Sequence, residues 1–66
     1  MRLRELRKQR GLSQLKLAVD LNMNQNTISR YECGEREADY ATLIRLADYF
    51  DVTIDYLLER TDLPKG

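Results

Sequence analysis

The stretch SQLKLAVDLNMNQNTISRYECG, residues 13–34, places the strongest constraint on the fold, because two helical patterns in it are joined by only three residues. Apolar spacing predicts one helix from about 14 to 21 and another from about 25 to 33. Asn22 falls at the join, and asparagine is one of the few residues besides glycine that tolerate a positive φ. The apolar positions of both helices would share an inner surface of Leu17, Leu21, Met23, Ile28 and Tyr31. This spacing indicates a helix-turn-helix unit over about 14–33.

The rest of the chain also shows helical patterns and no convincing strand. Leu3 and Leu6 mark the inward face of a first helix over about 2–10, which Gly11 ends. A fourth helix has an inward stripe of Leu43, Leu46, Ala47 and Phe50, and a fifth follows it. Helix N-caps are predicted at Ser13, Asn24, Asp39 and Thr53. We therefore predict an all-α, compact five-helix domain over residues 1–60 and a flexible C-terminal tail over 61–66.

Composition limits what so small a domain can do. With 66 residues, one cysteine and no histidine, the chain lacks an intramolecular disulfide, a His-containing metal site and room for a deep small-molecule pocket. No nucleophile is paired with a base and no glycine-rich phosphate loop occurs, so we expect neither an enzyme nor a cofactor. The start MRLRELRKQR lacks the apolar stretch of a signal peptide, and no apolar run is long enough to span a bilayer. We expect a soluble cytoplasmic protein without a membrane partner.

The formal charge is zero, but the charges are unevenly distributed along the chain. Residues 1–16 hold six basic residues against Glu5 alone, whereas residues 17–66 hold ten acidic residues against five basic ones. A basic end attracts a polyanion such as nucleic acid, although a solvated, charged helix face is an alternative reading of the run. The nucleic-acid-binding interpretation of this basic run therefore needs support from another part of the sequence.

Two segments, LRELRKQRGLSQLKLAVDLNMNQNTISRYECGE and TLIRLADYFDVTIDYLL, resemble the lambda-repressor-like family of phage and bacterial helix-turn-helix regulators, the Cro and repressor type or XRE family. The resemblance covers about 3–58. It implies a prokaryotic or phage-derived repressor whose third helix enters the major groove of a double-stranded DNA operator. The chain departs from the family at Asn22, where glycine is usual, and at Cys33, where polar or basic residues are usual. The acidic loop EREAD puts this loop's phosphate contacts in doubt and leaves Arg36 as its only cation.

The predicted third helix has an outward face made of residue types that read bases. At about 100° per residue, Ile28 and Tyr31 point inward, whereas polar side chains and Cys33 point outward. In the major groove arginine can bind guanine, asparagine or glutamine can bind adenine, and serine adapts to either. An ordinary solvated face would hold Glu and Lys, and asparagine, threonine and serine are poor helix formers. We therefore predict that bases are read by Gln25, Asn26, Ser29 and Arg30.

Five further residues are candidates for contacts with the DNA backbone: Ser13, Gln14, Asn24, Thr27 and Arg36. Hydroxyl and amide side chains beside the free amides of a helix N-terminus can donate to phosphates. For Ser13 and Asn24, capping of the helix is an equal alternative. In the family that the chain resembles, the glutamine matching Gln14 braces both a phosphate and the reading helix.

Glu32 is predicted to form a structural ion pair with Arg7. Glu32 lies about 40° from Ile28 around the third helix, so its carboxylate points inward and needs a partner. Arg7 is the candidate because it follows Leu6 on the first helix, and the family is similar in pairing an arginine of helix 1 with a glutamate of helix 3. Two unrelated surface charges are the alternative.

The resemblance also implies a homodimer. A reading helix covers only about four or five base pairs, so two copies are expected at half-sites about one helical turn apart. The predicted fifth helix and tail offer an apolar surface for the contact: Tyr56, Leu57, Leu58 and Leu63. All four tyrosines are expected to pack in or beside the core rather than to stack on single-stranded nucleic acid: Tyr31, Tyr40, Tyr49 and Tyr56. The alternative function is a helical protein-interaction module, such as an antitoxin-like partner binder.

Overall fold

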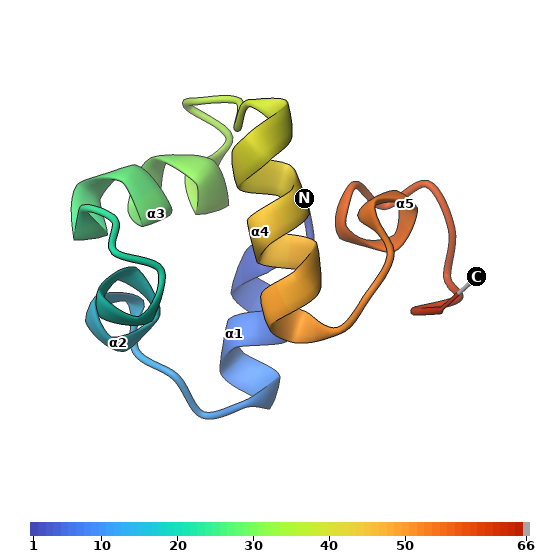
Figure 1. The fold of residues 1–66 in the computed structure, drawn as a ribbon, viewed down its shortest axis with the longest axis horizontal. Coiled ribbons are helices and arrows are strands. Elements are labelled where there is room, and N and C mark those ends of the chain that lie inside the picture. Colours follow the sequence, from blue (N-terminus) through green and yellow to red (C-terminus); the bar gives the residue numbers. More distant parts are fainter. Residues whose placement is uncertain (66) are drawn as a thin grey trace.

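The computed structural model describes residues 1–65 and contains five α-helices within them. They are α1 (Leu3–Gln9), α2 (Gln14–Asp20), α3 (Gln25–Cys33), α4 (Tyr40–Phe50) and α5 (Ile54–Leu57). Helices α2 and α3 lie at one side of the molecule and cross steeply, α1 and α4 occupy the middle, and α5 lies at the other side (Figure 1). The predicted all-α class and the helix-turn-helix unit of α2 and α3 are confirmed.

Helices α2 to α5 each begin at a side-chain cap. An oxygen of the capping side chain accepts a hydrogen bond from a backbone N–H two or three residues further along the chain. This bond satisfies one of the backbone donors that a helix leaves free at its start. The four predicted caps are therefore confirmed: Ser13, Asn24, Asp39 and Thr53.

All five described helices end in the same hydrogen-bonded turn, which requires one residue with a positive φ. After α2, the N–H of Asn22 donates to the Val19 carbonyl at 3.1 Å and the N–H of Met23 donates to the Ala18 carbonyl at 2.8 Å. Asn22 itself has a φ of 54°. The corresponding residues after the other helices are Gly11, Gly34, Asp51 and Glu59. Because this turn reverses the chain tightly, the four residues 21–24 are enough to join α2 to α3.

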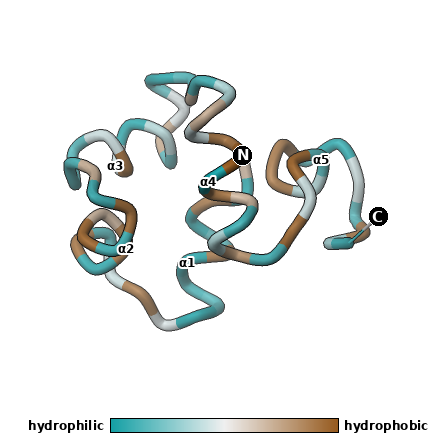
Figure 2. The backbone as a smooth tube through the Cα atoms, viewed as in Figure 1, coloured by the Kyte–Doolittle hydropathy of each residue, from teal (hydrophilic) through white to brown (hydrophobic). Residues whose placement is uncertain are grey.

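One apolar core is shared by the five helices. Its members have at most 9 % of their surface exposed, and they are Leu3, Leu6, Leu17, Ala18, Leu21, Ile28, Tyr31, Leu43, Leu46, Ala47, Phe50 and Leu57. The predicted inward stripes are therefore confirmed, and Met23 packs partly buried against the core. Figure 2 shows apolar segments on α2, α4 and α5, whereas α3 is largely hydrophilic.

Two of the apolar predictions are wrong. Tyr40 is 87 % exposed, because it is the first residue of α4 and precedes Leu43, the first core residue of that helix. Leu57 was expected on a dimer surface but is 0 % exposed. It faces the core because α5 is held against the start of the chain, where the N–H of Arg2 donates to the Leu57 carbonyl at 2.8 Å.

The segment after α5 folds back on the rest of the domain. The Arg2 guanidinium donates to the Thr61 carbonyl and to the Asp62 carboxylate, both at 3.0 Å. The N–H of Thr53 donates to the Pro64 carbonyl at 2.9 Å. The domain limits and the flexible tail over 61–66 stay predictions, and Gly66 lies outside the described residues. Across residues 1–65, no helix has the length and apolar character needed to cross a bilayer.

Candidate nucleic-acid interface

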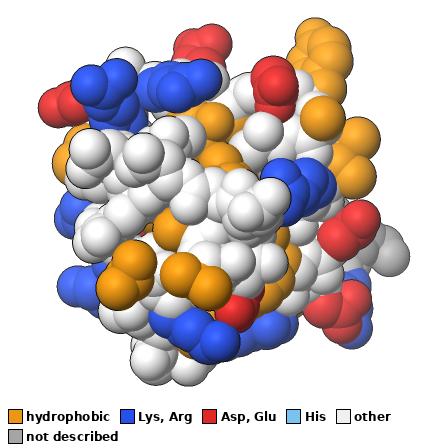
Figure 3. All heavy atoms as spheres, turned by 60° about the vertical axis from the view of Figure 1, so that its left-hand side comes forward, with side chains coloured by type: hydrophobic (Ala, Val, Ile, Leu, Met, Phe, Trp, Pro, Cys, Tyr) orange, Lys and Arg blue, Asp and Glu red, His pale blue; other side chains and the backbone are white. Residues whose placement is uncertain are grey.

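Helix α3 presents a polar face to solvent. Its buried side is formed by Ile28 and Tyr31, which are 0 % and 5 % exposed. The predicted base-reading residues lie on the other side: Gln25, Asn26 and Arg30 are exposed and Ser29 is partly exposed, and Cys33 is exposed at the end of the helix. In Figure 3, the side of the molecule with α2 and α3 shows a broad area of uncharged side chains and backbone, with lysine and arginine groups and some acidic groups around it.

The carboxylate of Glu32 is held by side chains from α1 and α2. The Glu32 side chain is 0 % exposed although its backbone is partly accessible. Arg7 donates to it from Nε at 2.7 Å and from Nη2 at 3.1 Å, Gln14 donates from Nε2 at 3.1 Å, and Arg4 donates from Nε at 3.3 Å. The structure thus contains the Arg7–Glu32 ion pair and adds Arg4, which we did not predict. Its position three residues before Arg7, on the same helix face, is the signal that could have identified it.

The network keeps Glu32 ionised inside the fold. Burial raises the pKa of the Glu32 carboxyl, but hydrogen bonds from Arg7 and Gln14 and the positive charge of Arg7 outweigh it and lower that pKa below its usual value. The hydrogen bond to Glu32 likewise raises the pKa of Arg7. Because α1 and α2 both donate to one residue of α3, the network fixes the orientation of the polar face of α3 relative to these two helices.

The first turn of α2 carries two of the predicted backbone-contact residues. The Ser13 hydroxyl oxygen accepts a hydrogen bond from the Lys16 N–H at 3.0 Å, which leaves the hydroxyl hydrogen able to donate. Gln14 uses one amide hydrogen on Glu32, and its second amide hydrogen remains for another acceptor. Capping and phosphate binding are therefore compatible at Ser13, and bracing of α3 and phosphate binding are compatible at Gln14.

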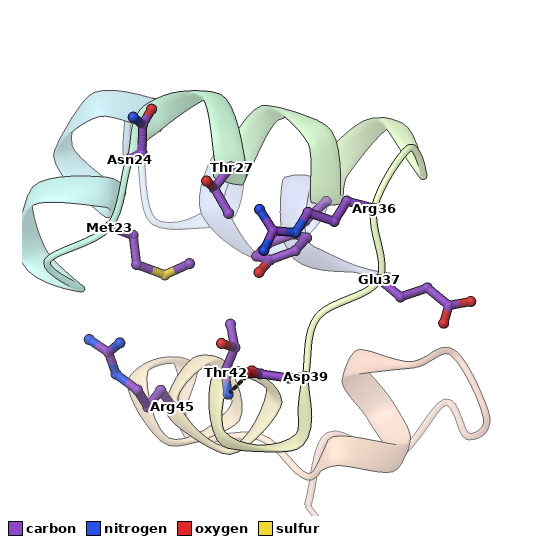
Figure 4. Close-up of a pocket in the computed structure, with 9 residues that line it drawn as sticks. Met23, Asn24, Thr27, Arg36, Glu37, Asp39, Thr42 and Arg45 are labelled. Atoms are coloured by element: carbon purple, nitrogen blue, oxygen red, sulfur yellow. Dashed lines mark hydrogen bonds between the residues drawn. The ribbon is translucent and has the colours of Figure 1, made fainter.

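The other predicted backbone-contact residues line a hollow between α3 and α4, which we call the α3–α4 cleft. It has a volume of about 340 Å³ and is lined by Met23, Asn24, Thr27, Tyr31, Arg36, Glu37, Asp39, Thr42 and Arg45 (Figure 4). The side-chain oxygen of Asn24 accepts from the Asn26 N–H at 2.8 Å, so the amide nitrogen of Asn24 remains a donor. Arg36 lies over the Tyr31 ring, 5.8 Å from its centroid. We did not predict Thr42 and Arg45, although their spacing places them on one face of α4 beside its apolar stripe.

The basic residues near the start of the chain are largely engaged within the fold. Arg10 donates to the Tyr49 and Phe50 carbonyls, at 3.1 and 2.9 Å, at the C-terminal end of α4. Lys16 pairs with Asp20 at 2.9 Å. The uneven charge distribution of the sequence therefore reflects intramolecular contacts to a large extent.

The chain has recognisable relatives. The family model described as "Helix-turn-helix" matches residues 3–57. The chain belongs to this helix-turn-helix family. No solved structure gives a significant match.

Three curated relatives illustrate the similarity of this helix-turn-helix chain. It is 42 % identical over 57 residues to the uncharacterized HTH-type transcriptional regulator YqaE of Bacillus subtilis, covering 86 % of the chain and 49 % of that protein. It is 38 % identical over 64 residues to the HTH-type transcriptional regulator ImmR of the same organism, covering 97 % and 50 %. It is 35 % identical over 60 residues to the SPbeta prophage-derived uncharacterized HTH-type transcriptional regulator YonR, also of Bacillus subtilis, covering 91 % and 56 %. The chain thus spans about half the length of the curated relatives it matches.

Proposed function

We propose that the chain is a sequence-specific, double-stranded DNA-binding transcriptional regulator, acting as a repressor, and that α3 reads the major groove. One observation carries this proposal. The exposed face of α3 holds amide, hydroxyl and guanidinium groups, while the carboxylate of Glu32 is turned inward and fully covered. A carboxylate on the exposed face would repel phosphate, so the arrangement favours a polyanionic partner. The three relatives, each named an HTH-type transcriptional regulator, support the same function.

Each reading residue has a role that follows from its chemistry. Arg30 donates to the O6 and N7 atoms of guanine, Gln25 and Asn26 pair with adenine, and Ser29 adapts to the base it meets. The Glu32 network holds these side chains at a fixed angle to α2. Because the helix is fixed before binding, little conformational freedom is lost when the complex forms.

The two flanks of α3 contact the two DNA strands that border the major groove. On one flank Ser13 and Gln14, at the start of α2, donate to phosphates of one strand. On the other flank Asn24, Thr27 and Arg36 donate to phosphates of the opposite strand. These contacts set the register of the domain on the duplex, and the base contacts then select the sequence.

The assembly on DNA is a homodimer, with one half-site for each copy. Of the predicted dimer surface, Leu58 and Leu63 are exposed, at 40 % and 66 % of their surface. Tyr56 is half-buried beneath the guanidinium of Arg2, which lies 4.4 Å from the centroid of its ring. The protein acts in the cytoplasm, and the prophage-derived relative YonR supports a phage origin.

Selection of bound sequences from random duplex DNA tests the proposal. We expect enrichment of one motif made of two symmetry-related half-sites. We also expect affinity for it to exceed that for a scrambled duplex by about a thousandfold or more at physiological salt. Equal binding to every duplex would contradict sequence-specific regulation, and binding to none would favour the protein-interaction module.

A further inference from the structure

The last turn of α2 has no basic residue of its own. The C-terminal end of a helix carries a negative partial charge and free carbonyl groups, and lysine or arginine in the last turn commonly stabilises it. In α2 the last turn contains no such residue, and the final residue of the helix is the acidic Asp20. The end of α2 therefore relies on donors from other parts of the chain.

Two side chains of α4 bind the end of α2. Arg45 donates from a terminal nitrogen to the carbonyl of Leu21, the residue that closes α2 before the turn. The Tyr49 hydroxyl donates to the Asp20 carboxylate at 2.7 Å. Because Arg45 and Tyr49 are four residues apart, they lie on the same face of α4. We call these two residues the α4 clamp.

The bond between Tyr49 and Asp20 joins two groups in fixed charge states. Hydrogen bonds from Lys16 and Tyr49 lower the pKa of the Asp20 carboxyl, and the hydrogen bond to Asp20 raises the pKa of the Tyr49 hydroxyl. At neutral pH the carboxylate is therefore ionised and the hydroxyl keeps its proton, as the hydrogen bond between them requires.

The α4 clamp holds the segment from which α3 begins. The turn bonds of Asn22 and Met23 and the cap bond of Asn24 all stay within the α2–α3 unit. In the described part of the chain, the bond from Arg45 is the one side-chain hydrogen bond that joins residues 21–24 to another helix. The α3–α4 cleft separates the start of α3 from α4 (Figure 4). The position of the first turn of α3 therefore depends on the turn that α4 holds.

The two halves of α3 are held by different contacts. In the second half, Glu32 accepts hydrogen bonds from α1 and from the first turn of α2. The first half, with Gln25 and Asn26, directly follows the turn that Arg45 holds. A displaced turn would therefore tilt the start of α3 while Glu32 keeps its end in place, and Arg30, close to Glu32 in the chain, would move less than Gln25.

We propose that the α4 clamp, Arg45 and Tyr49, positions the first turn of α3 for reading bases. Both are positioning residues, because they act through the end of α2 and touch no base. The inference rests on the proposed DNA-binding function, and it assigns part of the sequence selectivity to a helix outside the helix-turn-helix unit.

Two substitutions remove the hydrogen bonds of the clamp and keep most of its packing. Arg45→Met keeps an unbranched apolar side chain but has no N–H donor. Tyr49→Phe removes only the hydroxyl and keeps the ring against Phe50, with the two ring centroids 4.9 Å apart. Arg2→Met is the matched control, since it removes hydrogen bonds from a guanidinium to carbonyls at and after the end of α5, away from the α2–α3 unit.

Base selectivity is the first readout, measured by fluorescence anisotropy on one half-site of the selected motif and on its single-base variants. We expect Arg45→Met to lose about threefold to tenfold in affinity, because fewer molecules hold α3 in the binding-competent position. Selectivity should relax at the base pairs where Gln25→Ala relaxes it and persist where Arg30→Ala relaxes it. Tyr49→Phe should show a smaller change of the same kind, Arg45→Lys should restore part of the selectivity, and Arg2→Met should keep the wild-type preferences.

Amide hydrogen exchange is the second readout, and it separates a local effect from a general loss of stability. The N–H groups of Asn22 and Met23 form the turn after α2, and those of Gly11 and Leu12 form the same turn after α1. We expect Arg45→Met to speed exchange at Asn22 and Met23 and to leave Gly11 and Leu12 at the wild-type rate. A general loss of stability would speed exchange at both turns.

Three results would overturn the proposal. If Arg45→Met lowers the slope of log affinity against log salt by about one and leaves every base preference unchanged, Arg45 contacts a phosphate and does not position α3. If Arg45→Met and Tyr49→Phe both keep the wild-type affinity and base preferences, the clamp has no role in reading and the proposed function stands. If the wild type selects no duplex, the proposed function and this inference are both wrong.

Discussion

At the scale of single residues, the positions that end the helices carry the clearest backbone constraint. Gly11 and Gly34 adopt a positive φ freely, and Asn22 and Asp51 tolerate it because their short polar side chains are accepted there. Glu59 has a φ of 64° with a long side chain. The left-handed conformation costs such a residue about 1 kcal/mol or more, so the end of α5 is strained.

Replacing Glu59 with glycine should therefore stabilise the domain. We expect Glu59→Gly to raise the free energy of unfolding by about 1 kcal/mol and the melting temperature by about 4–8 °C. The substitution also removes the ion pair between Glu59 and the amino group of Met1 at 3.5 Å, but the Glu59 side chain is 58 % exposed and such pairs contribute little. Glu59→Ala is the control, since it loses the same ion pair and keeps the strained backbone. Equal melting temperatures for the two variants would show that the turn is not strained.

The pKa of Glu32 makes a separate prediction about acid stability. Because hydrogen bonds from Arg7 and Gln14 lower this pKa in the folded state against the effect of burial, the ionised carboxylate stabilises the fold above its unfolded pKa of about 4.3. This stabilisation is lost as the pH falls through the lower, folded value. Glu32→Gln should thus be less stable than the wild type at pH 7, and the difference should shrink in acid. Denaturant unfolding at several pH values measures the difference in free energy of unfolding between the wild type and Glu32→Gln. If that difference does not depend on pH, Glu32 is not ionised in the folded state.

At the scale of helices, the sequence predicts starts and ends better than it predicts what covers each face. The caps at Ser13 and Asn24 and the turn at Asn22 are local, because each depends on residues within one helical turn, so the spans of α2 and α3 follow from the pattern. The contacts of Arg45 with the Leu21 carbonyl and of Arg2 with the tail are not local. They join residues far apart in the chain, and spacing along one helix contains no information about them.

The candidate site shows the same difference between features that are local to one helix and contacts that join different helices. The polar, exposed face of α3 follows from helical periodicity alone, whereas the predicted Arg7–Glu32 pair rests on the inward direction of Glu32 together with the family resemblance. Arg4 was not predicted, although it lies three residues before Arg7 on the same face of α1, and Thr42 was not predicted because its neighbours in the cleft come from α3. The α3–α4 cleft depends on how the two helices pack against each other, which the sequence pattern does not specify.

The Glu32 network joins three helices, so its energy can be measured as a coupling. The Arg7 and Glu32 side chains are 11 % and 0 % exposed. Removal of Arg7 leaves the buried carboxylate only the longer hydrogen bonds from Arg4 and Gln14, and removal of Glu32 leaves the Arg7 guanidinium without its carboxylate. We expect Arg7→Ala and Glu32→Ala each to cost about 3–5 kcal/mol of stability. The double variant should cost clearly less than the sum of the two, because the second removal strands no further charge. Thermal melts of the single and double variants decide it, and strict additivity would show that the pair is not coupled.

At the scale of the whole molecule, a domain of this size needs a partner copy to mark a site in a genome. We expect footprints of two half-sites centred about 34 Å apart. Leu58→Ser should weaken joint occupancy of the two half-sites and leave binding to one half-site unchanged. Val19→Ser is the control, since Val19 is an exposed apolar residue of α2, at 64 %, outside the predicted dimer surface. Protection of a single asymmetric half-site at saturating protein would show that the chain binds as a monomer.

The proposed function depends above all on the exposed face of α3 selecting the DNA sequence. Selection from random duplex DNA, repeated with the wild type, Arg30→Ala and Gln25→Ala, tests it most directly. We predict that each variant loses about 1–3 kcal/mol on the wild-type motif and relaxes selectivity at one or two base pairs of each half-site, with the other positions unchanged. Recovery of the same motif, with the same preference at every position, by the wild type and both variants would contradict the assignment of α3 as the reading helix.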